Sequence, residues 1–434
     1  MFGYYVELAL RSLRRSRALT ALMILAVALG IGASITTLTV LHVLSGDPLP
    51  GRSGSIFMPR LDPRDKEGYD PTDELPAQVT WTDGNNLLHA ARGRRQALMT
   101  AGATPVQSDD LAIDPFIVPA RYTTTGFFPM FNVPFRYGQP WSAADDEARA
   151  RVAVIGAGLN DRLFHGQNSV GRTLHADGVD LRIVGVIDPW RAVPHFYDLN
   201  TGNYSVGEEI FVPLGTARTA KLKRNGGIEC WGNKSSDEDG METANCAWLQ
   251  FWVQLDDAAA VASYRRFLDG YAREQVALGR FERPVRTALP DVMQYLDEKR
   301  VVPSDVRLQV WLAFGFFVVC LVNTVGLMLA KFMRRAGEVG VRRALGASRR
   351  SVFAQLLTEA AVIGVAGGLG GLGIAMIGLA MVRLQPGALA QLAHLDTTML
   401  ATTFVISIVA TLVAGLIPAW RTCRIAPALQ LKSQ

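Results

Sequence analysis

The chain has few of the side chains from which a catalytic or metal site is usually built. Its six histidines show no paired spacing suited to a metal ion, and its four cysteines show none either. A Gly-x-Ser-x-Gly turn and a Gly-x-x-x-x-Gly-Lys-Ser/Thr phosphate loop are both absent from the 434 residues. We therefore expect neither catalysis nor a metal or cofactor site in this chain.

One segment is similar to the opening of a dinucleotide-binding fingerprint. A strand-like run at 152–155 is followed by Gly156 and Gly158, but Asp161 stands where a third glycine is needed for helix–sheet packing. The fingerprint is incomplete, so a nicotinamide cofactor is excluded.

Charge is scarce too, and it is missing altogether from four long stretches. Charged residues make up 19% of the chain and apolar residues 49%, and the uncharged runs are 18–44, 308–330, 360–382 and 399–420. At about 1.5 Å of rise per residue, each run can cross a hydrocarbon core of roughly 30 Å as a helix. A cleaved signal peptide is the alternative for the first run, but the apolar part of such a peptide is only about 7–15 residues long. The sequence predicts four transmembrane helices.

The charges that flank these runs give the orientation. The loop 331–351 holds seven Lys/Arg and one Glu, residues 1–17 hold four Arg and one Glu, and the tail 421–434 is basic. Short basic segments stay in the cytoplasm, which leaves 45–307 and 383–398 outside. The outer segment carries 29 basic and 35 acidic residues, so the sequence pI of about 9.1 reflects membrane topology rather than nucleic-acid binding.

The segment 45–307 is long enough to form an α+β domain of its own. We expect a helix at 80–99, strands at 151–155, 181–187 and 209–213, a half-buried strand at 247–255, a helix at 256–278 and a returning strand at 283–289. This pattern favours a ferredoxin-like, porter-like lobe with a β-rich lobe inserted at about 120–215. Cys230 and Cys246 both lie in this outer segment and are expected to form a disulfide, whereas Cys320 and Cys423 are expected to be free.

Polar and small residues stand out in the membrane segments. The third run contains the Gly-x-x-x-Gly pairs Gly364/Gly368 and Gly367/Gly371, which indicate close helix packing, within one chain or across a dimer. Asn323, Thr324 and Glu359 are polar groups in or near lipid, suited to helix–helix hydrogen bonding or to transmitting motion. Residues 1–17 have the pattern of an amphipathic helix on the inner membrane surface.

The most specific segment lies inside the basic loop. It consists of Glu338, Val339, Gly340, Val341, Arg342, Arg343, Ala344, Leu345, Gly346 and Ala347. Together with 323–329 before it, 356–360 after it, and 125–141, 152–155, 163–164, 170–174 and 183–187 in the outer segment, it closely resembles the FtsX/MacB-type (type VII) ABC transporter permeases. In that family the loop segment couples the permease to an ATP-binding subunit. Val339, Val341 and Leu345 are suited to be apolar knobs in a groove of the partner.

The resemblance implies a bacterial inner-membrane permease with a periplasmic domain at 45–307. The expected partners are a separate cytoplasmic ATPase that binds ATP and Mg, since only 17 residues precede the first span, and a second permease of the same or a different chain. The resemblance further implies mechanotransmission: ATP-driven movement of the loop shifts the outer domain. Efflux of periplasmic substrates (antibiotic, peptide or lipid-like) with an adaptor and an outer-membrane channel is the leading expectation. Lipoprotein extraction, or regulation of a cell-envelope hydrolase or signalling partner without transport, are the alternatives.

Overall fold

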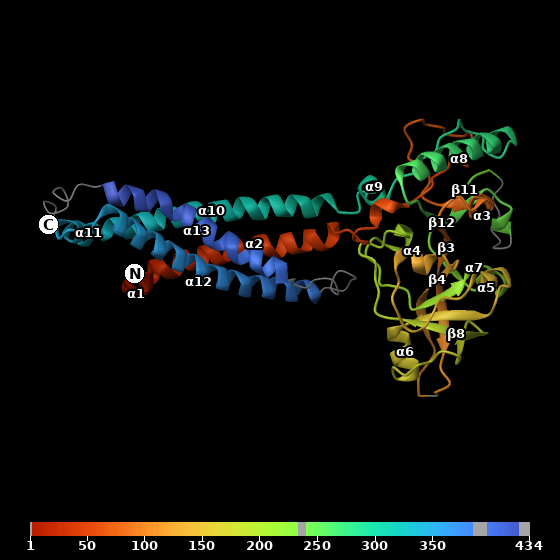
Figure 1. Ribbon diagram of the computed structural model, residues 1–434, viewed down its shortest axis with the longest axis horizontal. Coiled ribbons are helices and arrows are strands. Elements are labelled where there is room, and N and C mark those ends of the chain that lie inside the picture. Colours follow the sequence, from red (N-terminus) through yellow and green to blue (C-terminus); the bar gives the residue numbers. More distant parts are fainter. Residues whose placement is uncertain (1, 111, 233–239, 385–396, 425–434) are drawn as a thin grey trace. The chain divides into compact units, whose positions relative to one another are not determined.

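The computed structural model describes residues 2–110, 112–232, 240–384 and 397–424 (Figure 1). The chain divides into two compact units. Met1–Ser45 and Val302–Gln434 form a helical unit, and Gly46–Val301 forms a sheet unit. Most of the loop expected at 383–398, and residues 425–434 of the expected tail, lie outside the described residues.

The helical unit is a bundle of long helices. Its described elements are α1 (Phe2–Arg15), α2 (Arg17–Ser45), α10 (Ser304–Arg334), α11 (Ala336–Ala344), α12 (Arg349–Arg383) and α13 (Thr397–Arg424). Four stretches are long and apolar enough to cross a membrane: Arg17–Ser45, Ser304–Arg334, Arg349–Arg383 and Val405–Cys423. These helices lie side by side in Figure 1, with α2 packed on α10 and α12, and α13 packed on the same two helices. The prediction of four spans is confirmed.

The helix that carries the third span starts well before its uncharged run. Gly346, with a φ of +100°, makes the turn after α11, and this left-handed conformation favours glycine. Ser348 then caps α12, because its hydroxyl accepts a hydrogen bond from the Ser351 amide at 3.1 Å. Helix α12 therefore runs without a break from the basic loop into the membrane.

The sheet unit is built on one mixed sheet. Its main path has the strand order β1-β12-β3-β4-β9-β6-β8-β5, with β4–β9 and β6–β8 parallel. The strands are β1 (Ile56–Phe57), β2 (Val79–Thr80), β3 (Arg95–Gln107), β4 (Phe116–Thr123), β5 (Phe135–Gly138), β6 (Val152–Gly156), β7 (Thr173–Ala176), β8 (Val179–Ile187), β9 (Ile210–Pro213), β10 (Arg224–Asn225), β11 (Glu229–Cys230) and β12 (Cys246–Gln254). The helices are α3 (Trp81–Ala90), α4 (Phe127–Phe131), α5 (Ala143–Glu147), α6 (Ala157–Phe164), α7 (Leu214–Thr219), α8 (Ala258–Ala277) and α9 (Val292–Glu298), with 3₁₀ turns η1 (Ser53–Ser55), η2 (Leu199–Thr201) and η3 (Gly240–Glu242). The expected α+β class is confirmed.

Several predicted elements of the sheet unit are present. Strands β6, β8, β9 and β12 and helix α8 lie where the sequence pattern placed them. Helix α8 begins after Asp257, whose carboxylate accepts a hydrogen bond from the Ala260 amide at 2.8 Å. Strands β5 to β9 fall within the interval 120–215, and they continue the same sheet, because β4 pairs with both β3 and β9.

The prediction of a helix at 80–99 is correct only for the first half of that interval. Helix α3 ends at Ala90, Ala91 adopts a left-handed conformation with a φ of 48°, and Arg95–Gln107 is a strand. Strand β3 pairs with β12 on one side and β4 on the other, and Leu98 and Met99 are fully buried on its opposite faces. Pairing in the centre of the sheet thus outweighs the helical preference of this sequence.

The prediction of a strand at 283–289 is wrong. Within that interval the backbone makes only an isolated bridge between Arg60 and Ala288. The Arg283 side chain donates hydrogen bonds to the carbonyl oxygens of Asp65 at 2.6 Å and Glu67 at 3.1 Å, and these bonds hold the segment as a loop. Helix α8 is therefore not followed by a ladder strand there.

Strand β12 was expected to be half-buried, but both of its faces are covered. Trp248 stacks on Trp81 on one face, and Trp252 packs edge-on against Phe196 and Tyr295 on the other. The alternation in 247–255 therefore separates two apolar cores rather than a core from solvent.

Candidate functional site

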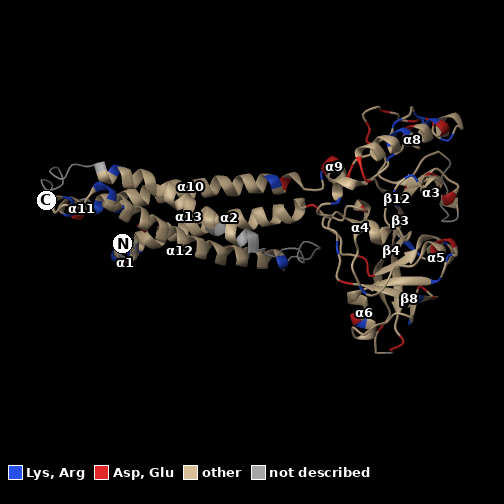
Figure 2. Ribbon diagram, in the orientation of Figure 1, with Lys and Arg blue, Asp and Glu red and all other residues tan. Residues whose placement is uncertain are grey.

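The basic loop folds as the short helix α11 between α10 and α12. Lys and Arg gather around α11, whereas the middle parts of the long helices are free of charge over their described residues (Figure 2). Of the three expected apolar knobs, Val341 and Leu345 are exposed, Leu345 to 82%. Val339 instead packs on the chain's own core beside Phe332 and Val352.

The remaining residues of 338–347 are likewise partly buried and partly exposed. Gly340 is buried, Glu338, Arg343 and Ala347 are half-buried, and Arg342, Ala344 and Gly346 are exposed. The exposed face of α11 is therefore basic with two apolar side chains. Such a face can enter an apolar groove with an acidic rim on a soluble protein.

Behind α11 lies a buried ion pair between two helices. The Lys331 ammonium on α10 contacts the Glu359 carboxylate on α12, and each side chain is only 1% exposed. Ser12 on α1 donates a hydrogen bond to Glu359 at 2.8 Å. The Thr20 hydroxyl on α2 lies 3.4 Å from the Lys331 nitrogen. Side chains from four helices thus meet at one buried carboxylate and one buried ammonium.

Arg335 connects this pair to helix α11. It sits between α10 and α11, with its guanidinium 3.1 Å from the Glu338 carboxylate and 3.9 Å from that of Glu359. The same guanidinium donates to the Ser12 hydroxyl, and Arg15 on α1 pairs with Glu338 on the exposed side. The ion pairs therefore link α1, α10, α11 and α12, and a displacement of α11 must act on them.

Sequence reasoning found only part of this network. It singled out Glu359 as a polar group near lipid, but neither Lys331 nor Ser12 as its partner. A signal was available: Lys331 immediately follows the uncharged run 308–330, and Glu359 immediately precedes the run 360–382. Two opposite charges at the ends of adjacent spans are well placed to pair at the membrane face.

The sequence left open whether the paired glycines of α12 pack within one chain or across a dimer, and the structure shows contacts within the chain. A Cβ on Gly364 would lie 2.0 Å from a Thr411 oxygen, and one on Gly368 would lie 2.9 Å from a Ser407 oxygen, both on α13. A Cβ on Gly367 or Gly371 would instead meet α2, at 2.6 and 2.9 Å. The two Gly-x-x-x-Gly pairs serve two different neighbours, both within this chain.

The paired glycines at the start of α6 do not form an anion site. The Glu209 carboxylate accepts a hydrogen bond from the Leu159 amide at 2.9 Å, and a Cβ on Gly156 would lie 2.6 Å from the same carboxylate. Burial raises the pKa of Glu209. An acid of the chain itself occupies the position where a dinucleotide phosphate would bind.

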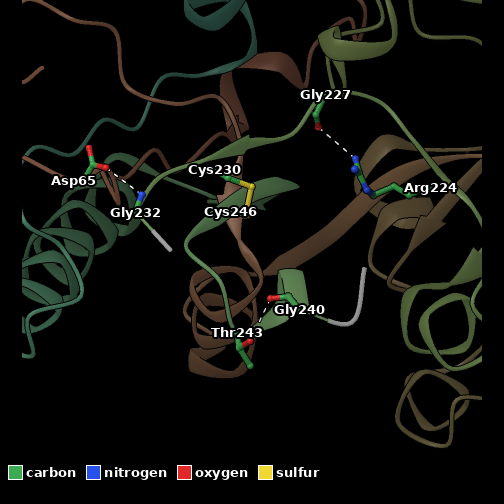
Figure 3. Close-up of a disulfide and its surroundings, with 8 residues drawn as sticks. All are labelled: Asp65, Arg224, Gly227, Cys230, Gly232, Gly240, Thr243 and Cys246. Atoms are coloured by element: carbon green, nitrogen blue, oxygen red, sulfur yellow. Dashed lines mark hydrogen bonds between the residues drawn. A yellow bond between two sulfur atoms is a disulfide. The ribbon is translucent and has the colours of Figure 1, made fainter. Parts of the chain in front are cut away.

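The disulfide expected from the sequence is formed in the structure (Figure 3). Cys230 on β11 lies directly opposite Cys246 on β12, so the bond joins two paired strands. Just after β11, the Gly232 amide donates a hydrogen bond to Asp65 at 3.1 Å. The bond closes a loop whose two ends are both attached to the sheet. Cys320 and Cys423 are free and buried.

One further charged cluster lies inside the sheet unit. The Arg121 guanidinium on β4 is completely buried and binds Asp198 at 2.7 Å and Glu208 at 3.0 Å, while the Tyr197 hydroxyl donates to Glu208 at 2.6 Å. Although burial disfavours the charged carboxylate, Arg121 and His195 lower the pKa of Glu208. The cluster is sealed from solvent and fastens the segment before β9 to the sheet. Over the described residues, no group of three or more His, Cys, Asp or Glu side chains is placed to hold a metal ion.

Two family models match the sequence of this chain. The MacB-like periplasmic core domain matches residues 20–269, and the FtsX-like permease C-terminal model matches residues 310–427. The chain belongs to the MacB/FtsX family of ABC transporter permeases. With four apolar spans and a MacB-like domain between the first two, this permease is an inner-membrane protein with a large periplasmic domain.

Curated relatives of this permease are larger proteins. The pyoverdine export ATP-binding/permease protein PvdT of Pseudomonas fluorescens is 22% identical over 99% of this chain and 59% of its own length. The macrolide export ATP-binding/permease protein MacB of Wolinella succinogenes is 22% identical over 99% and 60%, and that of Rhodospirillum rubrum is 24% identical over 89% and 55%. The chain thus spans about three fifths of the length of these relatives.

Solved structures of periplasmic regions are similar as well. The periplasmic region of MacB from Actinobacillus actinomycetemcomitans aligns with 59% of this chain and 97% of its own, with a TM-score of 0.38 and 10% identity.

Proposed function

We propose that this permease couples ATP hydrolysis in the cytoplasm to movement of its periplasmic domain, and that it serves the efflux of periplasmic substrates. A cytoplasmic ATPase on a separate polypeptide, holding ATP and Mg, would bind the exposed face of α11. Val341, Arg342 and Leu345 would make the contact.

The observation that carries this proposal is the connection of α11 to the spans. Val341 on α11 and Leu345 directly after it are exposed, and the Glu338–Arg335–Glu359–Lys331 ion pairs connect α11 to the cytoplasmic ends of α10 and α12. Helix α12 is in turn packed closely on α2, where Gly367 lies against Val27 and Gly371 against Ile31. A displacement of α11 would therefore displace α2 and α10. These are the two spans whose outer ends lead into the periplasmic domain.

Efflux is favoured over the alternatives by the names of the relatives. PvdT and MacB are described as pyoverdine and macrolide exporters, and they cover nearly the whole of this chain. A periplasmic adaptor, an outer-membrane channel and a second permease would complete the assembly.

The test is affinity purification of the protein from its native membrane in mild detergent with ATP present. We expect an ATPase and a periplasmic adaptor to co-purify. A lipoprotein-binding chaperone in place of the adaptor would favour extraction, and a peptidoglycan hydrolase would favour regulation. Absence of any ATPase would contradict the coupling role of α11.

A pair of variants focuses this test on α11. Leu345→Glu places a charge on the most exposed apolar side chain of the segment and is expected to abolish ATPase co-purification. Ala344→Ser changes an exposed neighbour on the same helix without adding charge, and should retain the ATPase. Equal recovery of the ATPase with both variants would show that α11 is not the docking face.

A further inference from the structure

The sheet unit contains an open cavity that is separate from the ion pairs around α11. Its walls are the segment 73–78 that leads into β2, the η2 turn, helix α9 and strand β11. Its volume is about 520 Å³, and its lining is mostly polar. Small-molecule sites in proteins have volumes of roughly 300–1,000 Å³, so this cavity is large enough to hold a small polar ligand.

Two nearly buried side chains in the lining of this cavity carry a polar atom without a partner. Tyr295 is 2% exposed, yet its hydroxyl makes no hydrogen bond to any described residue. The Gln78 amide nitrogen donates to the Gly227 carbonyl at 3.2 Å, but its oxygen accepts no hydrogen bond within the described part of the chain. Burial raises the pKa of Tyr295, so its hydroxyl keeps the proton and can donate. Buried polar groups are normally paired, which suits these two atoms to a ligand.

The walls of the cavity are held in place by other parts of the sheet unit. The buried Arg60 guanidinium donates hydrogen bonds to the carbonyl oxygens of residues 75–76. The disulfide between Cys230 and Cys246 joins β11 to β12 (Figure 3). It therefore fixes the backbone of Glu229, the neighbour of Cys230 that lines the cavity. The polar groups of the cavity are thus positioned before any ligand arrives.

The charge that this cavity offers to a ligand is negative. The two cations in its lining are already paired, because Arg64 binds Asp62 at 2.6 Å and is only 13% exposed. Lys299 likewise binds Glu74 at 2.6 Å, and the carboxylate is the more exposed partner, at 58% against 25%. Glu229 is exposed and forms no ion pair with the residues that the structure describes. A cationic ligand therefore finds a free carboxylate, whereas an anion finds only cations that already have a partner.

We propose that this cavity binds a small polar amine, whose ammonium group pairs with Glu229 while its other polar groups bind the Gln78 oxygen and the Tyr295 hydroxyl. Polyamines and amino sugars share this chemistry. The inference goes beyond the proposed function, because it assigns a ligand site in the periplasmic domain that does not involve α11.

The experiment is isothermal titration calorimetry of the full-length protein in detergent micelles with spermidine, glucosamine or N-acetylglucosamine. The first two compounds carry ammonium groups at neutral pH. N-acetylglucosamine is the sugar of the second compound with its amine acetylated and therefore uncharged. We expect saturable binding of spermidine or glucosamine and no binding of N-acetylglucosamine. The tighter of the two amines distinguishes a polyamine site from an amino-sugar site.

Three variants connect the binding to the cavity. Glu229→Gln removes the charge and keeps the shape of the side chain, and it should raise the dissociation constant of the amine about tenfold or more. Tyr295→Phe removes only the hydroxyl and should raise it about three- to tenfold. The matched control is Tyr264→Phe. The Tyr264 hydroxyl is also buried without a hydrogen-bond partner among the described residues, but it does not line this cavity, so the affinity should be unchanged.

Three results would overturn the proposal. They are no saturable binding of either amine up to about 10 mM, equal binding of glucosamine and N-acetylglucosamine, and an unchanged dissociation constant in Glu229→Gln. The measurement requires neither an ATPase nor an adaptor. Its failure is therefore distinguishable from a failure of the proposed coupling through α11.

Discussion

We predict that removing either partner of the buried Lys331–Glu359 pair lowers the unfolding free energy, and that the two single variants lose different amounts. Glu359→Gln replaces the carboxylate with a neutral amide, so the Lys331 ammonium stays 1% exposed with only neutral acceptors beside it, the amide oxygen and the Thr20 hydroxyl at 3.4 Å. Breaking a buried pair in this way costs about 3–5 kcal/mol of unfolding free energy. Lys331→Met leaves Glu359 with the Ser12 hydroxyl at 2.8 Å and the Arg335 guanidinium at 3.9 Å. We expect that variant to lose less, about 1–3 kcal/mol.

The double variant Lys331→Met/Glu359→Gln completes the cycle. It leaves neither charge buried and unpaired, so most of the stability lost in Glu359→Gln should return. The measurement is equilibrium unfolding of the full chain in mixed micelles, followed by helix content. If Lys331→Met were the more destabilising single change, or if the double variant lost the sum of both singles, the ion pair would not be organised as described.

Other predictions concern packing, pH and the disulfide. Gly364→Ala puts a methyl group 2.0 Å from a hydroxyl oxygen of α13 and should cost about 1–3 kcal/mol of unfolding free energy, whereas Gly373→Ala, with nothing within 4 Å, should cost little in the same assay. Burial raises the pKa of Asp146 to about 6, above its unfolded value of 3.8, so its contribution to stability is present below about pH 4 and is lost as the pH rises through 6. Asp146→Asn should flatten that part of the pH profile of tryptophan-detected unfolding, and an unchanged profile would refute the assignment. Reducing Cys230–Cys246, which are 16 residues apart, should lower the stability of the periplasmic domain by about 3 kcal/mol, and the double serine variant should no longer respond to reductant.

The helical spans were predictable from local sequence because each depends on residues close together in the chain. The run 308–330 contains no charge, so it predicts a membrane helix whatever surrounds it. The run 95–107 was assigned in part to a helix because its strand state depends on β12, which begins at Cys246 and pairs with it across the sheet. The prediction of a strand at 283–289 failed for the same kind of reason. The Arg283 side chain donates hydrogen bonds to the carbonyl oxygens of Asp65 and Glu67, which are distant in the sequence.

The sequence by itself determined the number of spans, their orientation and the family, because charge, apolar length and a short motif are properties of contiguous residues. Only the tertiary structure decided which groups meet. Ser12 and Glu359 are 347 residues apart in the chain, yet 2.8 Å apart in the bundle. Likewise, successive glycines of one helix serve two different neighbours. Such contacts depend on how the helices rotate against each other, which is set by the packing of all their faces at once.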